Sequence, residues 1–405
     1  MSGKWPGGVI SKTAPTVTGP TDGEGGSASG IWTLDQAADY AKQGLWPLPV
    51  IYRELWTWGR NNLGQRAQGN TTDYSSPVQV GALTDWKYTT AGKNYLLGQK
   101  TDGTLWAVGA GGSGRLGQGN TTNYSSPVQV GALTDWSNVA AGYRSVSAVK
   151  TDGTLWTWGD GNYGVLAQNN ATDYSSPVQV GVLTNWSNTE GGVRWVLAIK
   201  TDGTLWTWGY NNFGQLGQGN TTNYSSPVQI GSLTDWLNIG ASSYNAYATK
   251  TDGTLWAWGR NTWGQIGDGS LVDRSSPVQV GALTNWLSFS GGLYNVVARK
   301  TDGTLWSWGY NGQGQLGLGD TTYRTSPVQV GALTTWDSVT SNYKATAAIK
   351  TDGTLWTWGY NNKGQLGDGT ITSRSSPVQV GALTTWLTVN RGQQAAEGFA
   401  ATKTP

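Results

Sequence analysis

The side chains that could carry out chemistry are few, and they recur once per repeat instead of clustering. The 405-residue chain contains no Cys and no His, which excludes disulfides, thiolate metal sites, the usual zinc sites and Ser-His-Asp or Cys-His catalysis. Its Asp residues recur with a repeat, as Asp102 and Asp152 do, and do not form the carboxylate pair of acid–base catalysis. The Gly-x-x-Gly spacings lack the Lys-Ser/Thr of a phosphate-binding loop. We therefore expect a non-enzymatic protein with no cofactor and no metal.

Residues suited to binding occur instead in one variable segment of each repeat. This segment spans residues 93–95, 143–145, 193–195, 243–245, 293–295, 343–345 and 393–395. It combines aromatic rings with cationic and amide side chains, a mixture that favours recognition of a sugar or a protein loop. The alternative is that these turns vary because nothing constrains them. The sequence predicts a ligand- or partner-binding face formed by Tyr95, Tyr143, Arg144, Arg194, Trp195, Tyr244, Tyr294 and Lys344.

A strict repeat must position these segments. The string KTDGTLW recurs every 50 residues without insertion or deletion, with its lysine at Lys100, Lys150, Lys200, Lys250, Lys300 and Lys350. Seven copies are counted by Trp56, Trp106, Trp156, Trp206, Trp256, Trp306 and Trp356. A period of this length, with short strands and frequent turn signals, is typical of propellers. The fold class predicted for residues 51–405 is an all-β, seven-bladed β-propeller.

Each repeat is expected to contribute four strands, which in the second copy are residues 128–130, 136–141, 146–150 and 154–158. The Asp152-Gly153 pair predicts a tight hairpin turn between the last two. Strand direction places the variable turns on the same face as the long G-Q-L-G loops, and the TDG turns on the other. We expect the Lys and Asp side chains of the TDG turns to form a charged, solubilising rim.

The termini predict how the ring closes. The first repeat begins at Leu55 without a preceding KTDG, and the last repeat ends at Pro405, where its own LWTWG strand should follow. A blade cannot bury both faces alone, so an open ring would leave two apolar faces in water. Residues 53–59 are therefore predicted to complete the last blade.

Composition limits the partners. The 61 Gly suit loops, and the 25 Trp and 18 Tyr suit an aromatic core between blades. A net charge of +2 provides no general attraction for nucleic acid or a membrane surface. No segment has the length and apolarity of a membrane span, and residues 1–8 lack the apolar core of a signal peptide. We expect synthesis in a cytoplasm without export, and we take Asn70, Asn120, Asn170 and Asn220 of the N-x-T sequons as loop residues.

The repeat resembles the regulator of chromosome condensation family, which has seven-bladed propellers. The resemblance rests on the W-G-x-N-x-x-G-Q-L-G string of residues 208–217 and on the A-G pattern of residues 141–148, and it covers residues 51–405. It implies a fold shared by exchange factors, photoreceptors, lectin-like binders and scaffolds. Guanine-nucleotide exchange or another scaffold role is the alternative function. The absence of insertions and the basic variable turns argue against exchange, and the presence of only Trp195 in those turns argues against a light sensor.

The first 50 residues predict a separate attachment segment. Residues 1–30 are rich in Gly, Ser, Thr and Pro and predict an extended arm. A capping box at residues 33–36 predicts a short helix over residues 34–42. Residues 30–47 resemble a segment of tailed-bacteriophage virion proteins, which implies virion attachment through Ile31, Trp32, Leu34, Leu45 and Trp46.

This second resemblance implies a function. We expect a bacteriophage virion structural protein, a tail or capsid appendage, fibre or decoration protein, located in the virion after release by lysis. Residues 1–50 would bind other virion proteins, and the variable face would bind a host surface glycan or a neighbouring virion protein. Near-identical blades leave open whether the propellers also stack as a homo-oligomer.

Overall fold

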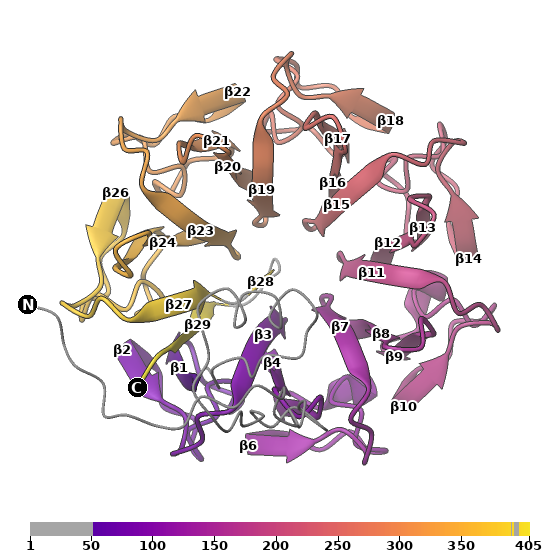
Figure 1. The fold of residues 1–405 in the computed structure, drawn as a ribbon, viewed down its shortest axis with the longest axis horizontal. Coiled ribbons are helices and arrows are strands. Elements are labelled where there is room, and N and C mark those ends of the chain that lie inside the picture. The colour runs from indigo at the N-terminus through magenta and orange to yellow at the C-terminus, as the bar shows by residue number, and fades with distance from the viewer. Residues whose placement is uncertain (1–51, 390, 393–396) are drawn as a thin grey trace, which may run out of the picture. The chain divides into compact units, whose positions relative to one another are not determined.

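The described residues form seven sheets arranged as blades around a common centre (Figure 1), and residues of the inner strands line a central channel. The structure is a computed structural model that describes residues 52–389, 391–392 and 397–405. The propeller is one compact unit, Arg53–Pro405. The predicted seven-bladed, all-β fold is confirmed. The predicted helix at residues 34–42 and the attachment residues Ile31, Trp32, Leu34, Leu45 and Trp46 lie outside the described residues.

Each blade has four strands, ordered from the channel outward. The strands next to the channel are β3 (Trp86–Gly92), β7 (Trp136–Ala141), β11 (Trp186–Gly191), β15 (Trp236–Ala241), β19 (Trp286–Gly291), β23 (Trp336–Ser341) and β27 (Trp386–Val389). The second strands are β4 (Tyr95–Lys100), β8 (Ser145–Lys150), β12 (Trp195–Lys200), β16 (Asn245–Lys250), β20 (Asn295–Lys300), β24 (Ala345–Lys350) and β29 (Gly398–Lys403).

The third and fourth strands complete each sheet. The third strands are β5 (Leu105–Gly109), β9 (Leu155–Gly159), β13 (Leu205–Gly209), β17 (Leu255–Gly259), β21 (Leu305–Gly309), β25 (Leu355–Gly359) and β1 (Glu54–Gly59). The outer strands are β6 (Tyr124–Gln129), β10 (Tyr174–Gln179), β14 (Tyr224–Gln229), β18 (Arg274–Gln279), β22 (Arg324–Gln329), β26 (Arg374–Gln379) and β2 (Tyr74–Gln79). Two single-turn 3₁₀ helices, η1 (Gly112–Gly114) and η2 (Asn162–Gly164), lie in the loops after β5 and β9. We number the blades 1 to 6 from β3–β6 to β23–β26, and the closing blade is blade 7.

The ring closes through strands from both ends of the chain. Blade 7 has the order β2-β1-β29-β27, and β1 pairs with β29 from Glu54 opposite Lys403 to Gly59 opposite Gly398. Closure by an N-terminal strand is therefore confirmed, but two N-terminal strands take part. A short strand, β28 (Arg391–Gly392), also pairs in parallel with β3 of blade 1.

The expected grouping of strands within a repeat was wrong for the Ser-Pro-Val-Gln strand. This strand, for example β6, pairs with β5 in blade 1, with Gln129 opposite Trp106, and not with the strands that follow it in blade 2. The G-A-L-T-x-W corner then crosses to the inner strand of the next blade. Pro127 fits because β6 is an edge strand, where a missing N–H costs no ladder hydrogen bond and discourages pairing with another chain.

Tryptophan side chains connect neighbouring blades. Trp258 in β17 of blade 4 is fully buried, and its Nε1 donates a hydrogen bond to the carbonyl oxygen of Gln215 in the loop of blade 3 at 2.9 Å. The equivalent bonds begin at Trp58, Trp158, Trp208, Trp308 and Trp358. Large aromatic area and a satisfied indole N–H thus connect six of the seven pairs of neighbouring blades, and Val108 takes the equivalent position in blade 1.

The KTDG turns are only partly the expected charged rim. Lys300 is buried, with its Nζ 3.6 Å from the ring centroid of Trp306 and 4.9 Å from that of Trp286. The lysine therefore contributes to the blade core through cation–π contacts. Asp302 is exposed at the tip, and its Oδ1 accepts hydrogen bonds from Thr304 N at 2.9 Å and Thr304 Oγ1 at 2.6 Å.

These aspartate turns predict loss of stability in acid. The hydrogen bonds from Thr304 Oγ1 and N hold the pKa of Asp302 below its ordinary value, and the same holds for Asp152, Asp202, Asp252 and Asp352. A lowered pKa in the folded state stabilises the fold above the unfolded value of ~3.9, and this contribution is lost as the pH falls through the folded pKa.

Urea unfolding at neutral pH and near pH 3 tests this expectation. The midpoint should fall in acid, and the Thr304→Val variant should lose less than the wild type because its Asp302 lacks the hydroxyl donor. An equal acid loss in both proteins would contradict this account of the turn.

Candidate functional site

The site lies at the face of the propeller where two kinds of connection meet. The turn between the inner and second strands and the long loop between the third and outer strands project from the same end of each blade. Contacts between them confirm the predicted placement: the Arg194 guanidinium, from the turn of blade 3, lies 5.2 Å from the ring centroid of Tyr163, from the loop of blade 2. We call this surface the turn face.

Six of the eight predicted residues lie on the turn face, and two do not. Tyr143, Arg144, Arg194, Tyr244, Tyr294 and Lys344 are partly exposed in the turns. Tyr95 and Trp195 are buried, with 1% and 0% of their surface exposed. The Tyr95 hydroxyl donates to the carbonyl oxygens of Gly142 and Ser145, each at 2.9 Å, and Trp195 Nε1 donates to the carbonyl oxygen of Ser243 at 3.0 Å.

The prediction for Tyr95 and Trp195 was therefore wrong, and the reason lies in the length of the turn. Both are the first residues of second strands, β4 and β12. Their side chains pack between blades and cannot meet a ligand on the face. The turn itself is tight, with Asn94 and Arg194 in the left-handed region at φ 61° and 64°.

The long loops add aromatic residues that the sequence analysis missed. Tyr210 and Phe213 come from the loop of blade 3, Arg260 and Trp263 from that of blade 4, and Tyr310 from that of blade 5. They occupy the first and the third of the three variable positions in the W-G-x-N-x-x-G string. The residue types at these positions differ from copy to copy, as they do in the turns. This variation is the sequence feature that could have identified the loop residues.

Aromatic loop and turn residues of blades 2 to 6 form three groups of ring contacts, which Arg260 and Lys344 bridge by cation–π contacts; we call this row the aromatic arc. Its rings are Tyr163, Tyr210, Phe213, Tyr244, Trp263, Tyr294, Tyr310, Tyr343 and Tyr360. Three of these ring contacts cross from one blade to the next, among them Phe213 with Tyr244, whose centroids are 5.0 Å apart, and Trp263 with Tyr310, whose centroids are 4.9 Å apart.

Cations lie among these rings. The Arg260 guanidinium is 4.9 Å from the Phe213 centroid and 5.6 Å from that of Tyr294, and Lys344 Nζ is 5.9 Å from that of Tyr310. Five cations of the turn face make no ion pair with a carboxylate in the part of the chain that the structure describes: Lys93, Arg144, Arg194, Arg260 and Lys344.

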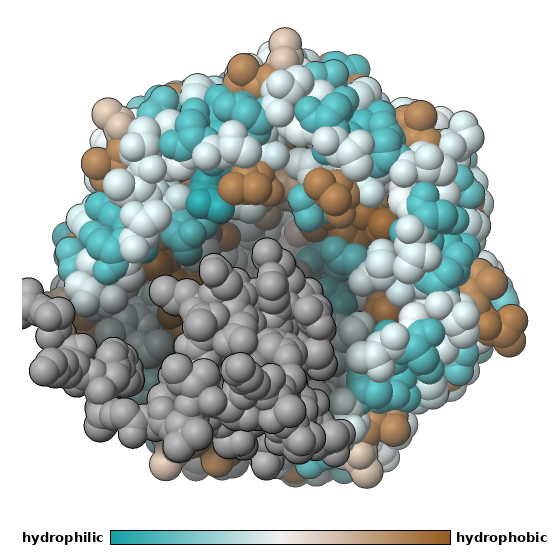
Figure 2. All heavy atoms as spheres, viewed as in Figure 1, coloured by the Kyte–Doolittle hydropathy of each residue, from teal (hydrophilic) through white to brown (hydrophobic). Residues whose placement is uncertain are grey.

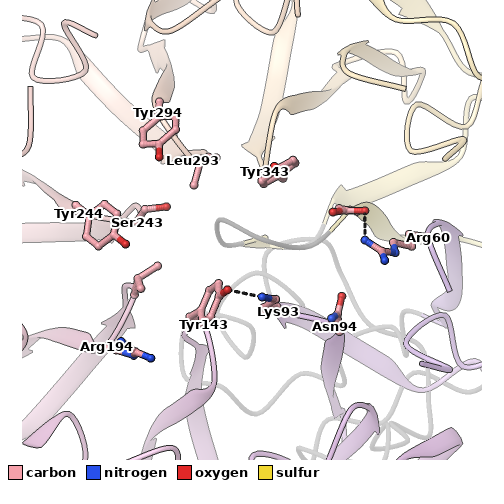
Figure 3. Close-up of a pocket in the computed structure, with 12 residues that line it drawn as sticks. Arg60, Lys93, Asn94, Tyr143, Arg194, Ser243, Tyr244, Leu293, Tyr294 and Tyr343 are labelled. Carbon is pink, nitrogen blue, oxygen red and sulfur yellow. Dashed lines mark hydrogen bonds and ion pairs between the residues drawn. The ribbon is translucent and has the colours of Figure 1, made fainter. Parts of the chain in front are cut away.

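A hollow of about 540 Å³ lies where the turns surround the channel mouth (Figure 3). Its described lining includes Lys93, Arg194 and Ser243 together with Tyr143, Tyr244 and Tyr294. Figure 3 shows the Tyr244 and Tyr294 side chains extending toward this space, and Lys93 Nζ bonded to the Tyr143 hydroxyl.

Two tyrosines of the hollow, Tyr244 and Tyr343, are held in their protonated form. Burial raises the pKa of Tyr244, and the neighbouring Tyr294 and Tyr210 raise it further. Burial also raises the pKa of Tyr343, with Glu397 as the next cause. These phenols therefore act as hydrogen-bond donors at neutral pH and not as bases.

The opposite end of each blade carries a different surface. The leucines of the G-A-L-T corners are exposed in every copy, as in Leu233 at 47% and Leu283 at 44%. Figure 2 shows one face of the ring, where the apolar residues form separate patches among hydrophilic ones in the part that is not grey. No helix in the described ranges is long and apolar enough to cross a membrane, and no three acidic side chains gather among the described residues in a way that could hold a metal.

The fold and the turn face define a class of protein: a seven-bladed propeller with one face built from turns and long loops. Comparison with family models matches residues 134–400 to the RCC1-like domain and residues 102–149 to the regulator of chromosome condensation (RCC1) repeat. The first match spans about two-thirds of the chain, so the chain belongs to the RCC1-like domain family. Among curated proteins, no match was found.

Solved structures share the fold at low sequence identity. The yeast RCC1 (Prp20) bound to Kap60 has a TM-score of 0.77 and 17% identity, over 88% of this chain and 90% of that chain. Human WBSCR16 has a TM-score of 0.75 and 16% identity, over 87% and 98%. Prp20p from Saccharomyces cerevisiae, described with its binding to Gsp1p and histones, has a TM-score of 0.74 and 18% identity, over 91% and 94%. At these identities the likeness shows the fold alone.

Proposed function

We propose that this chain is a non-enzymatic interaction protein that binds a partner macromolecule through the turn face of its propeller. The observation that carries the proposal is the aromatic arc with its cations, among them Arg194, Arg260 and Lys344, which make no ion pair with a carboxylate among the described residues. Tyr, Trp and Arg side chains are the residue types that dominate binding energy at protein interfaces. Their rings offer a large contact area at a low cost in conformational entropy.

Membership of the RCC1-like domain family supports this proposal. The similar yeast propellers are described with protein partners, namely Kap60, Gsp1p and histones. An interaction role is the part of such descriptions that suits the aromatic and cationic side chains of the turn face. The identity of the partner stays a proposal, because fold does not determine function.

A more specific form of the proposal is a bacteriophage virion appendage, located in the virion. It is supported by the resemblance of residues 30–47 to phage virion segments, and it assigns attachment to Ile31, Trp32, Leu34, Leu45 and Trp46. The turn face would then engage a host surface glycan or a neighbouring virion protein. Sedimentation of the protein with purified virions, with and without residues 1–50, is the test of this form.

Guanine-nucleotide exchange is a second candidate because of the family match. It requires a partner GTPase to bind the propeller and release its nucleotide. Release of labelled GDP from purified small GTPases should accelerate in the presence of the full chain if this candidate is correct. Unchanged release across a GTPase panel would exclude it.

Truncation of the arc should abolish partner binding without unfolding the ring. We expect the combined variant Phe213→Ala, Trp263→Ala and Tyr310→Ala to weaken binding at least about tenfold, since each ring is a contact worth ~1 kcal/mol or more. Labelled full chain is titrated onto candidate bacterial host cells and onto immobilised small GTPases.

The matched control truncates three exposed apolar residues at the opposite face, Leu233→Ala, Leu283→Ala and Leu333→Ala. This control should bind like the wild type, and both variants should melt close to it. Binding that survives truncation of the arc, or that the leucine control loses equally, would show that the turn face is not the binding surface.

A further inference from the structure

We propose that the hollow at the centre of the turn face binds a carboxylate of an acidic segment of a partner protein, while the aromatic arc packs against the residues that flank it. This inference rests on the proposed function and names the ligand class of the same face.

The hollow presents hydrogen-bond donors from several blades. Lys93, Arg194, Tyr244 and Tyr294 come from the turns of blades 1, 3, 4 and 5. Among the described lining residues the only carboxylate is Glu397, and it is occupied by Arg60, with its Oε2 2.8 Å from Arg60 Nη1. A wall with many donors and one engaged carboxylate complements a ligand that supplies acceptors and negative charge.

Ser243 is the second, independent observation. It is 0% exposed and lines the hollow, yet its Oγ has no hydrogen-bond partner in the part of the chain that the structure describes. Its backbone is held in place, because the Ser243 carbonyl oxygen accepts from Trp195 Nε1 at 3.0 Å and from Val193 N at 3.1 Å. A buried hydroxyl without a partner is costly, so an acceptor brought by a ligand would relieve that cost.

Arg194 makes the anion preference stronger. Its Nε is buried and has no hydrogen-bond partner among the described residues, while its guanidinium stacks on Tyr163. The stacking fixes the side chain beside the hollow, so that little conformational entropy is lost when it binds a carboxylate. Arg194 has a left-handed backbone conformation, with φ at 64°, and this conformation sets the direction of its Cα–Cβ bond.

The arc favours an acidic protein segment over an acidic polysaccharide. Sugars stack on open ring faces, whereas rings in the arc meet edge to face, with interplanar angles of 69° for Tyr163 and Tyr210 and 62° for Trp263 and Tyr310. Arg260 also lies near the rings of Phe213, Tyr244 and Tyr294. Such a surface offers narrow contacts that suit side chains of a peptide.

The test measures fluorescence anisotropy of a fluorescein-labelled ten-residue peptide of alternating glutamate and leucine, titrated with the full chain. A peptide with glutamine in place of glutamate is the uncharged control, and an oligosaccharide of galacturonate is the competing anion. The double variant Arg194→Gln with Tyr294→Phe removes one charge and one hydroxyl from the hollow. The variant Lys87→Gln removes the same charge at the far end of an inner strand, where Lys87 is exposed.

We expect the glutamate peptide to bind at least about tenfold more tightly than the glutamine peptide, the double variant to lose that preference, and Lys87→Gln to keep it. Equal binding of both peptides would overturn the inference, as would binding of the galacturonate oligosaccharide without the peptide. If either result occurs while partner binding remains sensitive to truncation of the arc, the proposed function stands and only the ligand class is wrong. If arc truncation also leaves partner binding unchanged, both proposals fail.

Discussion

Deletion of residues 398–405 should unfold the propeller, whereas deletion of residues 1–50 should leave it folded. The first deletion removes β29, which pairs with β1 along six residue pairs and also with β27. It also removes Phe399, whose ring centroid is 5.9 Å from that of Trp58, and Lys403, whose Nζ is 2.7 Å from Glu54 Oε2. Two strand edges and two apolar blade faces would then be open to water.

The expected loss is therefore comparable to the whole stability of a folded domain, roughly 5–15 kcal/mol. Near-UV circular dichroism and size-exclusion chromatography measure it directly. The shortened chain should lose its tryptophan signal and elute as an expanded or aggregated species. Deletion of residues 1–50 is the matched control, because the propeller unit begins at Arg53. A native spectrum and an unchanged melting temperature after removal of β29 would contradict closure through this strand.

Replacement of Trp258 by alanine should produce the largest destabilisation of any single substitution considered. The indole is 0% exposed and packs at 6.3 Å from the ring of Trp236, and its N–H bonds to Gln215 across the blade boundary. A cavity of this size in a close-packed core costs ~3–5 kcal/mol. Neighbouring side chains cannot collapse into the cavity that the substitution leaves, because the backbones of two blades fix its walls.

A graded series separates packing from hydrogen bonding. Trp258→Phe keeps most of the apolar contact but leaves the Gln215 carbonyl oxygen without its donor, so a smaller loss of ~1–3 kcal/mol is expected. Leu233→Ala, at an exposed corner, should change the free energy of unfolding by less than ~0.5 kcal/mol. Urea unfolding followed by tryptophan fluorescence ranks the three variants. Equal losses in the alanine and phenylalanine variants would show that the hydrogen bond, and not the ring, carries the stabilisation.

The same physics explains the correction at Trp195. Its variation between copies suggested a ligand contact, yet the side chain lies between blades and donates to Ser243. The variation there reflects different ways of filling one interblade space, with Tyr95 in one blade and Asn245 or Ala345 in others. Variation alone does not separate a residue that meets a ligand from one whose neighbour has changed with it.

The number of blades and the closure of the ring could both be predicted from the amino-acid sequence. A period without insertions specifies seven equal units, and the first repeat supplies the LWTWG strand that the last repeat lacks. This complementarity specifies how the ring is joined, as β1 beside β29 confirms. Alternation within 136–141 and the Asp-Gly turn at Asp152 are local properties, which is why the observed β7 begins and ends at the expected residues. The predicted positions of Arg194, Tyr244 and Tyr294 on one face followed from strand direction alone.

The blade to which each outer strand belongs could be seen only in the tertiary structure. The same is true of the contacts that each side chain makes on the turn face. The loop of one blade contacts the turn of the next blade, and this brings Phe213 against Tyr244 and Arg260 against Tyr294. Those pairs have no fixed spacing that a local pattern could reveal. Burial is likewise a property of the neighbouring blade. It places Trp195 in the core, leaves Tyr244 beside the hollow and leaves the Ser243 Oγ without a hydrogen-bond partner among the described residues.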